Sequence, residues 1–274
     1  MSNFYSMYSI FFKLIFFLFF WALSVSAKDI CSDQQLKNET VKTTSNAFNK
    51  FDWSVLDRQL VIIGDNHAYT SPDDIFAIEQ RLPQIQRGNA CLFLEFPISL
   101  DIETFKQKLN IDPEDSEQRA YIRYYRQIVN QAESLGLQIH LVDHPDHFKQ
   151  QQPISLRNTT MATNIKNLFD VSTCSSGIQI VGEAHIAPDD ETFGSIRDSL
   201  TNLKLTNAAI NFVYANKPPP NPILEKWNFI CTDKSFIPSS PVIFPIDRIK
   251  DLPLWPKYSQ KATYEYFDYT ILIP

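Results

Sequence analysis

Short apolar runs and longer amphipathic segments alternate along most of the chain. Five runs rich in Val, Ile, Leu and Phe are too short for helices, so they predict buried strands at 59–64, 90–96, 137–142, 178–181 and 208–214. The segments between them carry apolar residues at helical spacing. Strands that alternate with helices predict right-handed crossovers and an α/β fold, with a mainly parallel sheet flanked by helices.

Capping residues and turn formers set the expected helix ends. Ser71 is expected to cap a helix that runs toward Arg87, unless Pro83 kinks it or ends it early. A longer helix is expected over 114–134, with Gly136 as its stop. One face of that helix carries Tyr121, Tyr124, Ile128, Ala132 and Leu135. These aromatic and aliphatic side chains are expected to pack against the core.

The pattern is less regular toward the C-terminus. Ser155 is expected to cap a further helix, and another helix is expected over 189–203. Three consecutive prolines then break the alternation at 218–220. The region 217–274 is therefore expected to be an extension packed on the core, 28–216, rather than an independent domain. Its strand candidates lie at 242–244 and 264–273.

The N-terminus has the composition of an export signal. Lys13 precedes an apolar segment, 14–25, which ends in small residues up to Ala27. This segment is short for a membrane span, so residues 1–27 are expected to be a signal peptide cut after Ala27, with an uncleaved anchor as the alternative. Cys31 does not directly follow the cleavage point, so lipid attachment is not indicated. The protein is expected to be periplasmic or secreted, with no stable membrane span after cleavage.

Composition narrows the class of protein. Apolar residues make up 44% of the chain, which is enough for a packed core. The formal net charge of -6 and the lack of a basic stripe give no support for a nucleic-acid partner. Only six glycines occur and no glycine-rich phosphate loop is present, which argues against nucleotide chemistry. Export makes disulfides an option, with three connectivities for four cysteines, although Cys91 is equally compatible with a buried thiol. The four are Cys31, Cys91, Cys174 and Cys231.

A repeated motif gives the clearest indication of a site. Gly64-Asp65-Asn66-His67 and Gly182-Glu183-Ala184-His185 each follow a predicted strand. Ligands bind beyond the carboxyl ends of strands in open α/β sheets, so both motifs are expected to face one region. Glu95 interrupts an apolar strand, and a carboxylate there is costly unless it is paired or bound to a metal.

Two chemistries fit these residues. His67, Glu95 and His185 can together hold a divalent ion such as Mn, Co or Zn, which would activate water. Without a metal, either histidine can act as general base, oriented by a neighbouring carboxylate. Arg157 is a candidate for stabilising an oxyanion. No G-x-S-x-G elbow occurs, which argues against a serine hydrolase.

Simpler interpretations remain open for several of these residues. Asp143 can merely cap the turn before Pro145. His144 and His147 resemble a metal-binding tract, but a polar loop is the favoured interpretation. Arg157 can pair with an acidic residue on its own helix.

Several motifs in order resemble the Tiki superfamily, which includes erythromycin esterases, ChaN-like haem-binding proteins, TraB and Tiki proteases. They are Gly64-Asp65-Asn66-His67, Leu94-Glu95-Phe96-Pro97, Val142-Asp143-His144-Pro145, Arg157-Asn158-Thr159-Thr160-Met161-Ala162-Thr163-Asn164-Ile165 and Gly182-Glu183-Ala184-His185. The resemblance implies a site at His67, Glu95 and His185, supported by Asp65, Glu183, Asp143 and Arg157. Asp65 stands where many members carry Glu, and the region after Lys217 falls outside the resemblance.

The resemblance leaves more than one function open. The first hypothesis is an exported hydrolase that cleaves an ester or amide bond of a small molecule or peptide. The alternative is a haem-binding protein of iron uptake, for which a Tyr or His should face an open apolar pocket. A secreted effector or toxin that acts on a host protein is a third hypothesis, which the export signal permits. Fold alone does not decide among them.

Overall fold

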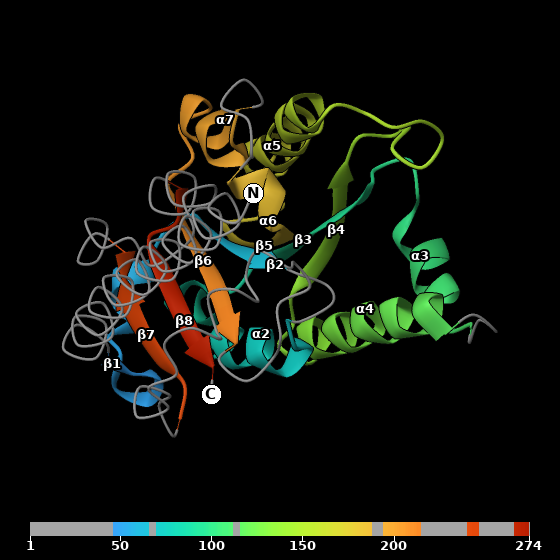
Figure 1. Cartoon of the computed structure of the whole chain (residues 1–274). Coiled ribbons are helices and arrows are strands. Elements are labelled where there is room, and N and C mark those ends of the chain that lie inside the picture. Colours follow the sequence, from blue (N-terminus) through green and yellow to red (C-terminus); the bar gives the residue numbers. More distant parts are fainter. Residues whose placement is uncertain are drawn as a thin grey trace, which may run out of the picture.

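A single sheet organises the part of the chain that the structure describes. The computed structural model describes residues 46–65, 70–111, 116–187, 194–214, 240–246 and 266–273. Eight strands are hydrogen-bonded there in the order β1-β7-β8-β6-β2-β5-β3-β4 (Figure 1). All pairings among β2, β3, β4, β5, β6 and β8 are parallel, whereas β7 runs antiparallel to β1 and β8. The α/β fold with a mainly parallel sheet is confirmed.

The bounds of the elements are as follows. The strands are β1 (Asn46–Ala47), β2 (Leu60–Asp65), β3 (Ala90–Pro97), β4 (Gln138–Asp143), β5 (Ser176–Gly182), β6 (Asn207–Tyr214), β7 (Val242–Pro245) and β8 (Tyr269–Ile273). The α-helices are α2 (Pro72–Glu79), α3 (Ile102–Leu109), α4 (Ser116–Ser134), α5 (Ile154–Asp170), α6 (Glu183–Ile186) and α7 (Ile196–Asn202). Short 3-10 helices are η1 (Phe48–Lys50), η2 (Trp53–Leu56) and η3 (Pro83–Arg87).

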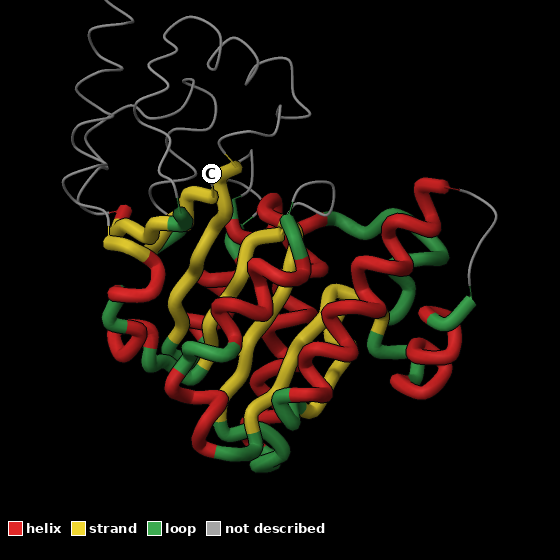
Figure 2. The backbone as a smooth tube through the Cα atoms, turned by 90° about the horizontal axis from the view of Figure 1, so that it is seen from below, coloured by secondary structure: helices red, strands yellow, loops and turns green. Residues whose placement is uncertain are grey.

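Helices cover both faces of the sheet (Figure 2). Alternate strand residues point to opposite faces, so Val61 and Ile63 of β2 pack in one core cluster while Leu60 and Ile62 pack in the other. The first cluster includes residues of α2, α3 and α4, and the second includes residues of α5, α6 and α7. Figure 1 shows α5 beside α7, well apart from α2 and α4. Burial of strand residues on both faces explains their nearly continuous apolar runs.

Two expected helix starts are wrong, each for a local reason. The residue before the first helical turn of α5 is Pro153, which has no side-chain cap, and Ser155 lies inside that turn. α7 does not begin near residue 189, because Gly194 has a positive φ of 58° and Ser195 then forms a capping box with Asp198. Residues 188–193 lie outside the described part of the chain.

Other helix ends agree with the expectations. Ser71 accepts a hydrogen bond from the backbone N–H of Asp73 at the start of α2, and the helix ends before Pro83, the earlier of its two expected ends. Gly136, with a φ of 73°, follows α4. α3 was not expected, and the side chain of Asp101 caps it by accepting from the N–H of Thr104.

The C-terminal strands join the same sheet. β8 pairs with β6 and β7 pairs with β8, so both lie on the core. The expected signal segment, 1–27, and most of the region 217–274 lie outside the described residues. Within the described part of the chain, the helices include none with the length and apolar character needed to cross a membrane.

Candidate functional site

The carboxyl ends of four neighbouring strands gather four acidic residues. β2, β5, β3 and β4 lie side by side in the sheet (Figure 1). Asp65 ends β2, Glu183 directly follows β5, Glu95 lies near the end of β3, and Asp143 ends β4. The register places Asp65 opposite Gly182 and Pro97 opposite Asp143. The structure therefore brings these four predicted residues to one edge of the sheet.

His67 lies in the segment 66–69, which is outside the described residues. Its predicted place beside Glu95 and His185 stays a prediction. The strands that lead into the two motifs are nevertheless adjacent, because β2 and β5 pair in register from Leu60 opposite Gly177 to Asp65 opposite Gly182.

Both carboxylate oxygens of Glu95 have hydrogen-bonding partners. Its Oε1 accepts from Arg157 and lies 3.0 Å from Nε2 of His185, and its Oε2 accepts from the N–H of Gly182 at 2.8 Å. Burial raises the pKa of Glu95, but the hydrogen bond and charge of His185, together with Arg157, outweigh burial and lower it to about 2. Glu95 is therefore an anion at neutral pH.

A break in register helps to position Glu95. Leu94 lies opposite Leu141 but Pro97 lies opposite Asp143, so β3 has one residue more than β4 over this stretch. Bulges of this kind redirect side chains near strand ends. Glu95 thereby turns toward α5 and α6 rather than into the apolar core.

Arg157, in the first turn of α5, joins two of the strand ends. Its Nε lies 3.1 Å from both carboxylate oxygens of Asp143, and its Nη2 donates to Asp143 at 2.5 Å and also to Glu95. Asp143 is fully buried. Its Oδ1 also accepts a hydrogen bond from the N–H of His144 at 2.7 Å. Asp143 therefore also caps the turn before Pro145, as the simpler interpretation predicted. Arg157 pairs with these strand-end acids, which contradicts the simpler interpretation of a pair within its own helix.

Both ring nitrogens of His185 face acceptors. Nδ1 lies 2.5 Å from Oδ1 of Asn158, and Nε2 faces the carboxylate of Glu95. The amide nitrogen of Asn158 donates to the carbonyls of His185 and Gly194, which fixes its Oδ1 as the acceptor toward Nδ1. The imidazole is thus held between the carboxylate of Glu95 and the amide of Asn158, with a partner at each ring nitrogen.

Glu183 has a different environment. Burial, aided by the charge of Asp65, raises the pKa of Glu183 to about 7. A Cβ on Gly64 would lie 3.3 Å from Cγ of Glu183 and 3.0 Å from the ring of Phe267. Any larger residue at position 64 would require the side chains of Phe267 and Glu183 to shift by a few tenths of an ångström. Glu183 thus faces the end of β2, and His185 faces the end of β3, on either side of β5.

Sequence reasoning named Asn158 only as part of a motif and favoured a polar loop for His147, so it gave neither residue a role in the cluster. Asn158, which orients His185, directly follows Arg157 in α5, and that adjacency was the available signal. His147 Nε2 lies 4.0 Å from Oδ2 of Asp143, and burial with the charge of Arg157 lowers the pKa of His147. His144 is a turn residue as expected, since its Nδ1 accepts from the N–H of Asp146 at 3.2 Å.

The tyrosines of α4 pack as predicted. Tyr124 and Tyr125 are buried, and Tyr121 lies against Tyr125 with ring centroids 4.8 Å apart. They extend the apolar core on the α4 face. Burial, together with the charges of Glu95 and Asp65, raises the pKa of Tyr121 to about 12, so its hydroxyl lies within electrostatic reach of the acidic cluster.

A group of three potential metal ligands lies elsewhere. Among the described residues, Cys91, His140 and Cys174 have ligand atoms that all lie within 4.8 Å of one another. Cys91 and Cys174 form a disulfide, which decides between the two interpretations of Cys91 in favour of a bridge. Sulfurs joined in a disulfide are not thiolates and do not bind a metal in that state.

The described residues of the acidic cluster do not fit a metal as they lie. Glu95 and His185 are each other's partners, and Arg157 already places a cation on Glu95. A divalent ion on Glu95 would have to displace the contact with Arg157 and the contact with Nε2 of His185. The predicted metal site at His67, Glu95 and His185 depends on His67 and stays a prediction.

Comparisons with known proteins leave the family open. No protein-family model matches the chain, and no curated protein matches it. One solved structure, titled "The structure of the type III effector HopBA1", is similar with a TM-score of 0.39 and 17% sequence identity. The match covers 57% of this chain and 77% of that chain. A likeness at this TM-score supports no statement about the fold or activity of this chain.

Proposed function

We propose that this chain is an exported hydrolase that cleaves an ester or amide bond by acid–base catalysis without a metal. The observation that carries the proposal is the contrast between two titratable groups on either side of β5. The ring nitrogens of His185 lie beside Glu95 and Asn158, whereas burial and the charge of Asp65 raise the pKa of Glu183 to about 7. Groups whose environments differ in this way commonly divide the roles of acid and base.

Each group then has a definite role. The carboxylate of Glu183 accepts a proton from a water as its oxygen bonds to the carbonyl carbon of the substrate. His185 exchanges its Nε2 contact with Glu95 for one with the leaving alcohol or amine and donates its Nε2 proton to it as the bond to that carbon breaks. The proton on Glu183 returns to His185 through solvent, so the cycle is balanced. Arg157 and Asn158 are positioning residues, because their contacts are with Glu95, Asp143 and His185.

Export is supported by two independent features. The N-terminal segment has the composition of a signal peptide, and disulfides persist in oxidising compartments, as Cys91–Cys174 requires. The substrate is proposed to be a small molecule or a peptide. Haem binding, the alternative from the sequence, is tested directly by a haem titration followed by the Soret band.

The test is hydrolysis of a panel of chromogenic esters, lactones and fluorogenic peptides in the presence of a strong chelator. Wild type is compared with Glu183→Gln and His185→Gln. Controls of the same chemistry are Glu133→Gln on the exposed face of α4 and His144→Gln in the loop after β4. Far-ultraviolet circular dichroism and thermal unfolding establish that each variant is folded.

We expect chelated wild type to hydrolyse at least one member of the panel. Loss of one proton-transfer group should lower kcat/KM by about 10²–10⁴-fold in the Glu183 and His185 variants and leave the controls unchanged. Activity that disappears with the chelator and returns with Mn, Co or Zn would favour the metal mechanism instead. A chain inactive on every substrate, or folded variants with full activity, would refute the proposed roles.

A further inference from the structure

A second cluster of reactive side chains lies away from the carboxyl ends of the strands, where the acidic cluster is. Cys91 is near the start of β3, His140 is on β4, and Cys174 follows α5. Phe93 and His140 are paired residues of β3 and β4, and Cys91 precedes Phe93 by two positions. The side chains of Cys91, Phe93 and His140 therefore point to the same face of the sheet. Cys91 is fully buried and Cys174 is 2% exposed.

The separations suit a common ligand. Two thiolates on one zinc, each at about 2.3 Å, lie less than about 4.6 Å apart, and a histidine nitrogen binds at about 2.0 Å. The ligand atoms of Cys91, His140 and Cys174 all lie within 4.8 Å of one another. Small side-chain rotations therefore bring the three to the distances that a tetrahedral ion requires.

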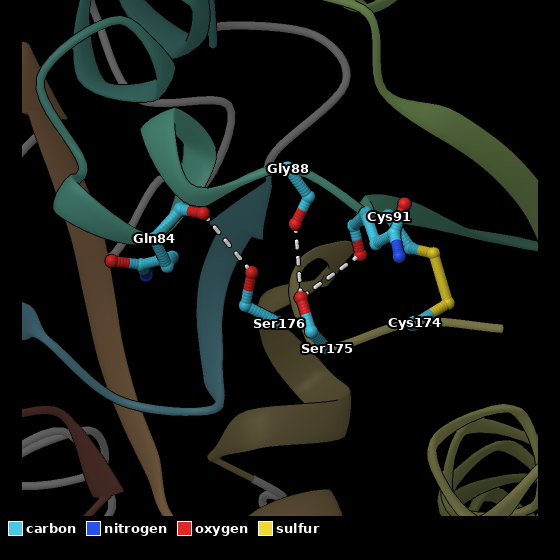
Figure 3. The surroundings of a disulfide bond; sticks show 7 residues. Gln84, Gly88, Cys91, Cys174, Ser175 and Ser176 are labelled. Atoms are coloured by element: carbon cyan, nitrogen blue, oxygen red, sulfur yellow. Dashed lines mark hydrogen bonds between the residues drawn. A yellow bond between two sulfur atoms is a disulfide. The ribbon is translucent and has the colours of Figure 1, made fainter. Parts of the chain in front are cut away.

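The backbone holds the two cysteines together independently of their sulfur bond (Figure 3). Ser175, next to Cys174, donates its backbone N–H to the carbonyl of Asn89 at 2.9 Å, and its hydroxyl donates to the carbonyl of Gly88 at 3.0 Å. The hydroxyl of Ser176 donates to the carbonyl of Gln84 at 3.1 Å. Reduction of the disulfide leaves these contacts in place, so the thiols stay adjacent.

His140 is suited to be the third ligand. Its Nε2 is buried and has no hydrogen-bond partner in the described structure, which is costly for a polar atom. A bound cation would satisfy this otherwise orphaned nitrogen.

We propose that Cys91, Cys174 and His140 form a binding site for a thiolate-preferring divalent ion such as zinc when the disulfide is reduced. The disulfide and the ion are then alternative occupants of one position. A dithiol or phosphine reductant supplies two electrons to the S–S bond, and two protons from solvent give the thiols. Binding of the ion releases those two protons, and a water completes a four-coordinate shell. This site is independent of the proposed hydrolase chemistry.

Co²⁺ is the probe, because tetrahedral thiolate coordination gives visible d–d bands and near-ultraviolet charge-transfer absorption. The full chain is titrated with Co²⁺, oxidised and after reduction with a phosphine. The same titration is made on His140→Ala, on Cys174→Ser, and on His144→Ala as a matched histidine outside the cluster. A variant in which Cys31 and Cys231 are both replaced by serine leaves Cys91 and Cys174 as its only cysteines.

We expect one Co²⁺ per reduced chain, displaced by Zn²⁺, in wild type, His144→Ala and the chain without Cys31 and Cys231. Oxidised protein and Cys174→Ser should show no such bands. Binding to His140→Ala should be weaker by at least about tenfold, the smaller loss seen when support for a metal ligand is removed. Absence of the bands in reduced wild type would overturn the proposal. Equal affinity in His140→Ala would also overturn it, because thiols of an unfolded chain would bind without the histidine.

Discussion

Glu95 is the residue on which the acidic cluster depends. It lies between Arg157 and His185 and accepts from the N–H of Gly182, so one anion links α5, α6 and the end of β5. Removing the Glu95 carboxylate is costly, because it leaves the buried charge of Arg157 with one carboxylate partner fewer and the N–H of Gly182 without its acceptor. The same charge makes this interaction sensitive to acid.

The pKa of Glu95 predicts how its contribution to stability varies with pH. Because the folded-state pKa is lowered from 4.5 to about 2, the contribution is fully present above pH 4.5 and is lost as pH falls toward 2. Glu95→Gln should therefore lower the free energy of unfolding at pH 7 by about 3–5 kcal/mol. The difference between wild type and variant should shrink on acidification. Urea unfolding of wild type and Glu95→Gln at pH 3 and pH 7 measures the loss of stability and its dependence on pH. A loss of the same size at both pH values would contradict the conclusion that Glu95 is an anion in the folded protein.

Which site residues could be predicted depended on their position relative to strands. Asp65, Glu95, Asp143 and Glu183 were found because each lies at the end of an apolar run, where the sheet fixes its location. Asn158 and His147 come from a helix and a loop, whose approach to the cluster depends on packing that local sequence does not encode. The extra residue in β3 that turns Glu95 toward Arg157 had no local signal either.

At the scale of elements, α2 carries a buried ionisable group that has no role in the proposed site. Glu79, the last residue of α2, is 1% exposed, and its Oε1 has no hydrogen-bond partner in the described structure. Burial raises the pKa of Glu79 from 4.5 to about 8. The folded protein therefore holds this carboxyl neutral at pH 7, whereas the unfolded chain ionises it.

Glu79 should make the protein less stable as pH rises. The contribution of Glu79 to the free energy of unfolding is fully present below pH 4.5 and is lost as pH increases through about 8. Between those values the free energy of unfolding falls by about 1.4 kcal/mol per pH unit. Glu79→Gln should remove this loss and give higher stability than wild type at pH 8. Thermal unfolding at pH 5 and pH 8 tests this, with the exposed Glu103→Gln of α3 as control. Parallel pH profiles for wild type and Glu79→Gln would show that Glu79 is not buried as described.

Helices were harder to predict than strands because their limits depend on single capping residues. α3 has apolar side chains at Ile102, Phe105 and Leu109, and Asp101 caps it, so its pattern was present but short. The helix expected from residue 189 instead begins at Ile196, since the capping box of Ser195 and the positive φ of Gly194 set its start. The buried strands needed no such detail, because burial on both faces requires an apolar run.

At the scale of the whole molecule, one disulfide joins distant segments. Cys91 and Cys174 are 83 residues apart in sequence and link the start of β3 to the segment after α5. Closing a loop of this size restricts the unfolded chain, which the chain-entropy model values at about 4–5 kcal/mol, against a typical measured range of about 2–4 kcal/mol. The pairing was one of several open at the sequence level, because connectivity depends on the folded backbone.

Replacing both Cys91 and Cys174 with alanine should lower the free energy of unfolding by about 2–4 kcal/mol. Oxidised wild type is the reference for urea unfolding, and Ser175→Ala serves as a control for the hydrogen bonds beside the bridge. Stability equal to that of oxidised wild type would mean that the bridge does not form in the purified protein.

The central claim is that Glu183 and His185 transfer protons in a hydrolysis that needs no metal. The most direct measurement is kcat/KM for the best substrate of the panel, determined with metal-free protein whose ion content is verified by mass spectrometry. The account predicts undiminished turnover by metal-free wild type and a loss of about 10²–10⁴-fold in Glu183→Gln. Turnover that requires a near-stoichiometric divalent ion, or that persists in folded Glu183→Gln, would contradict it.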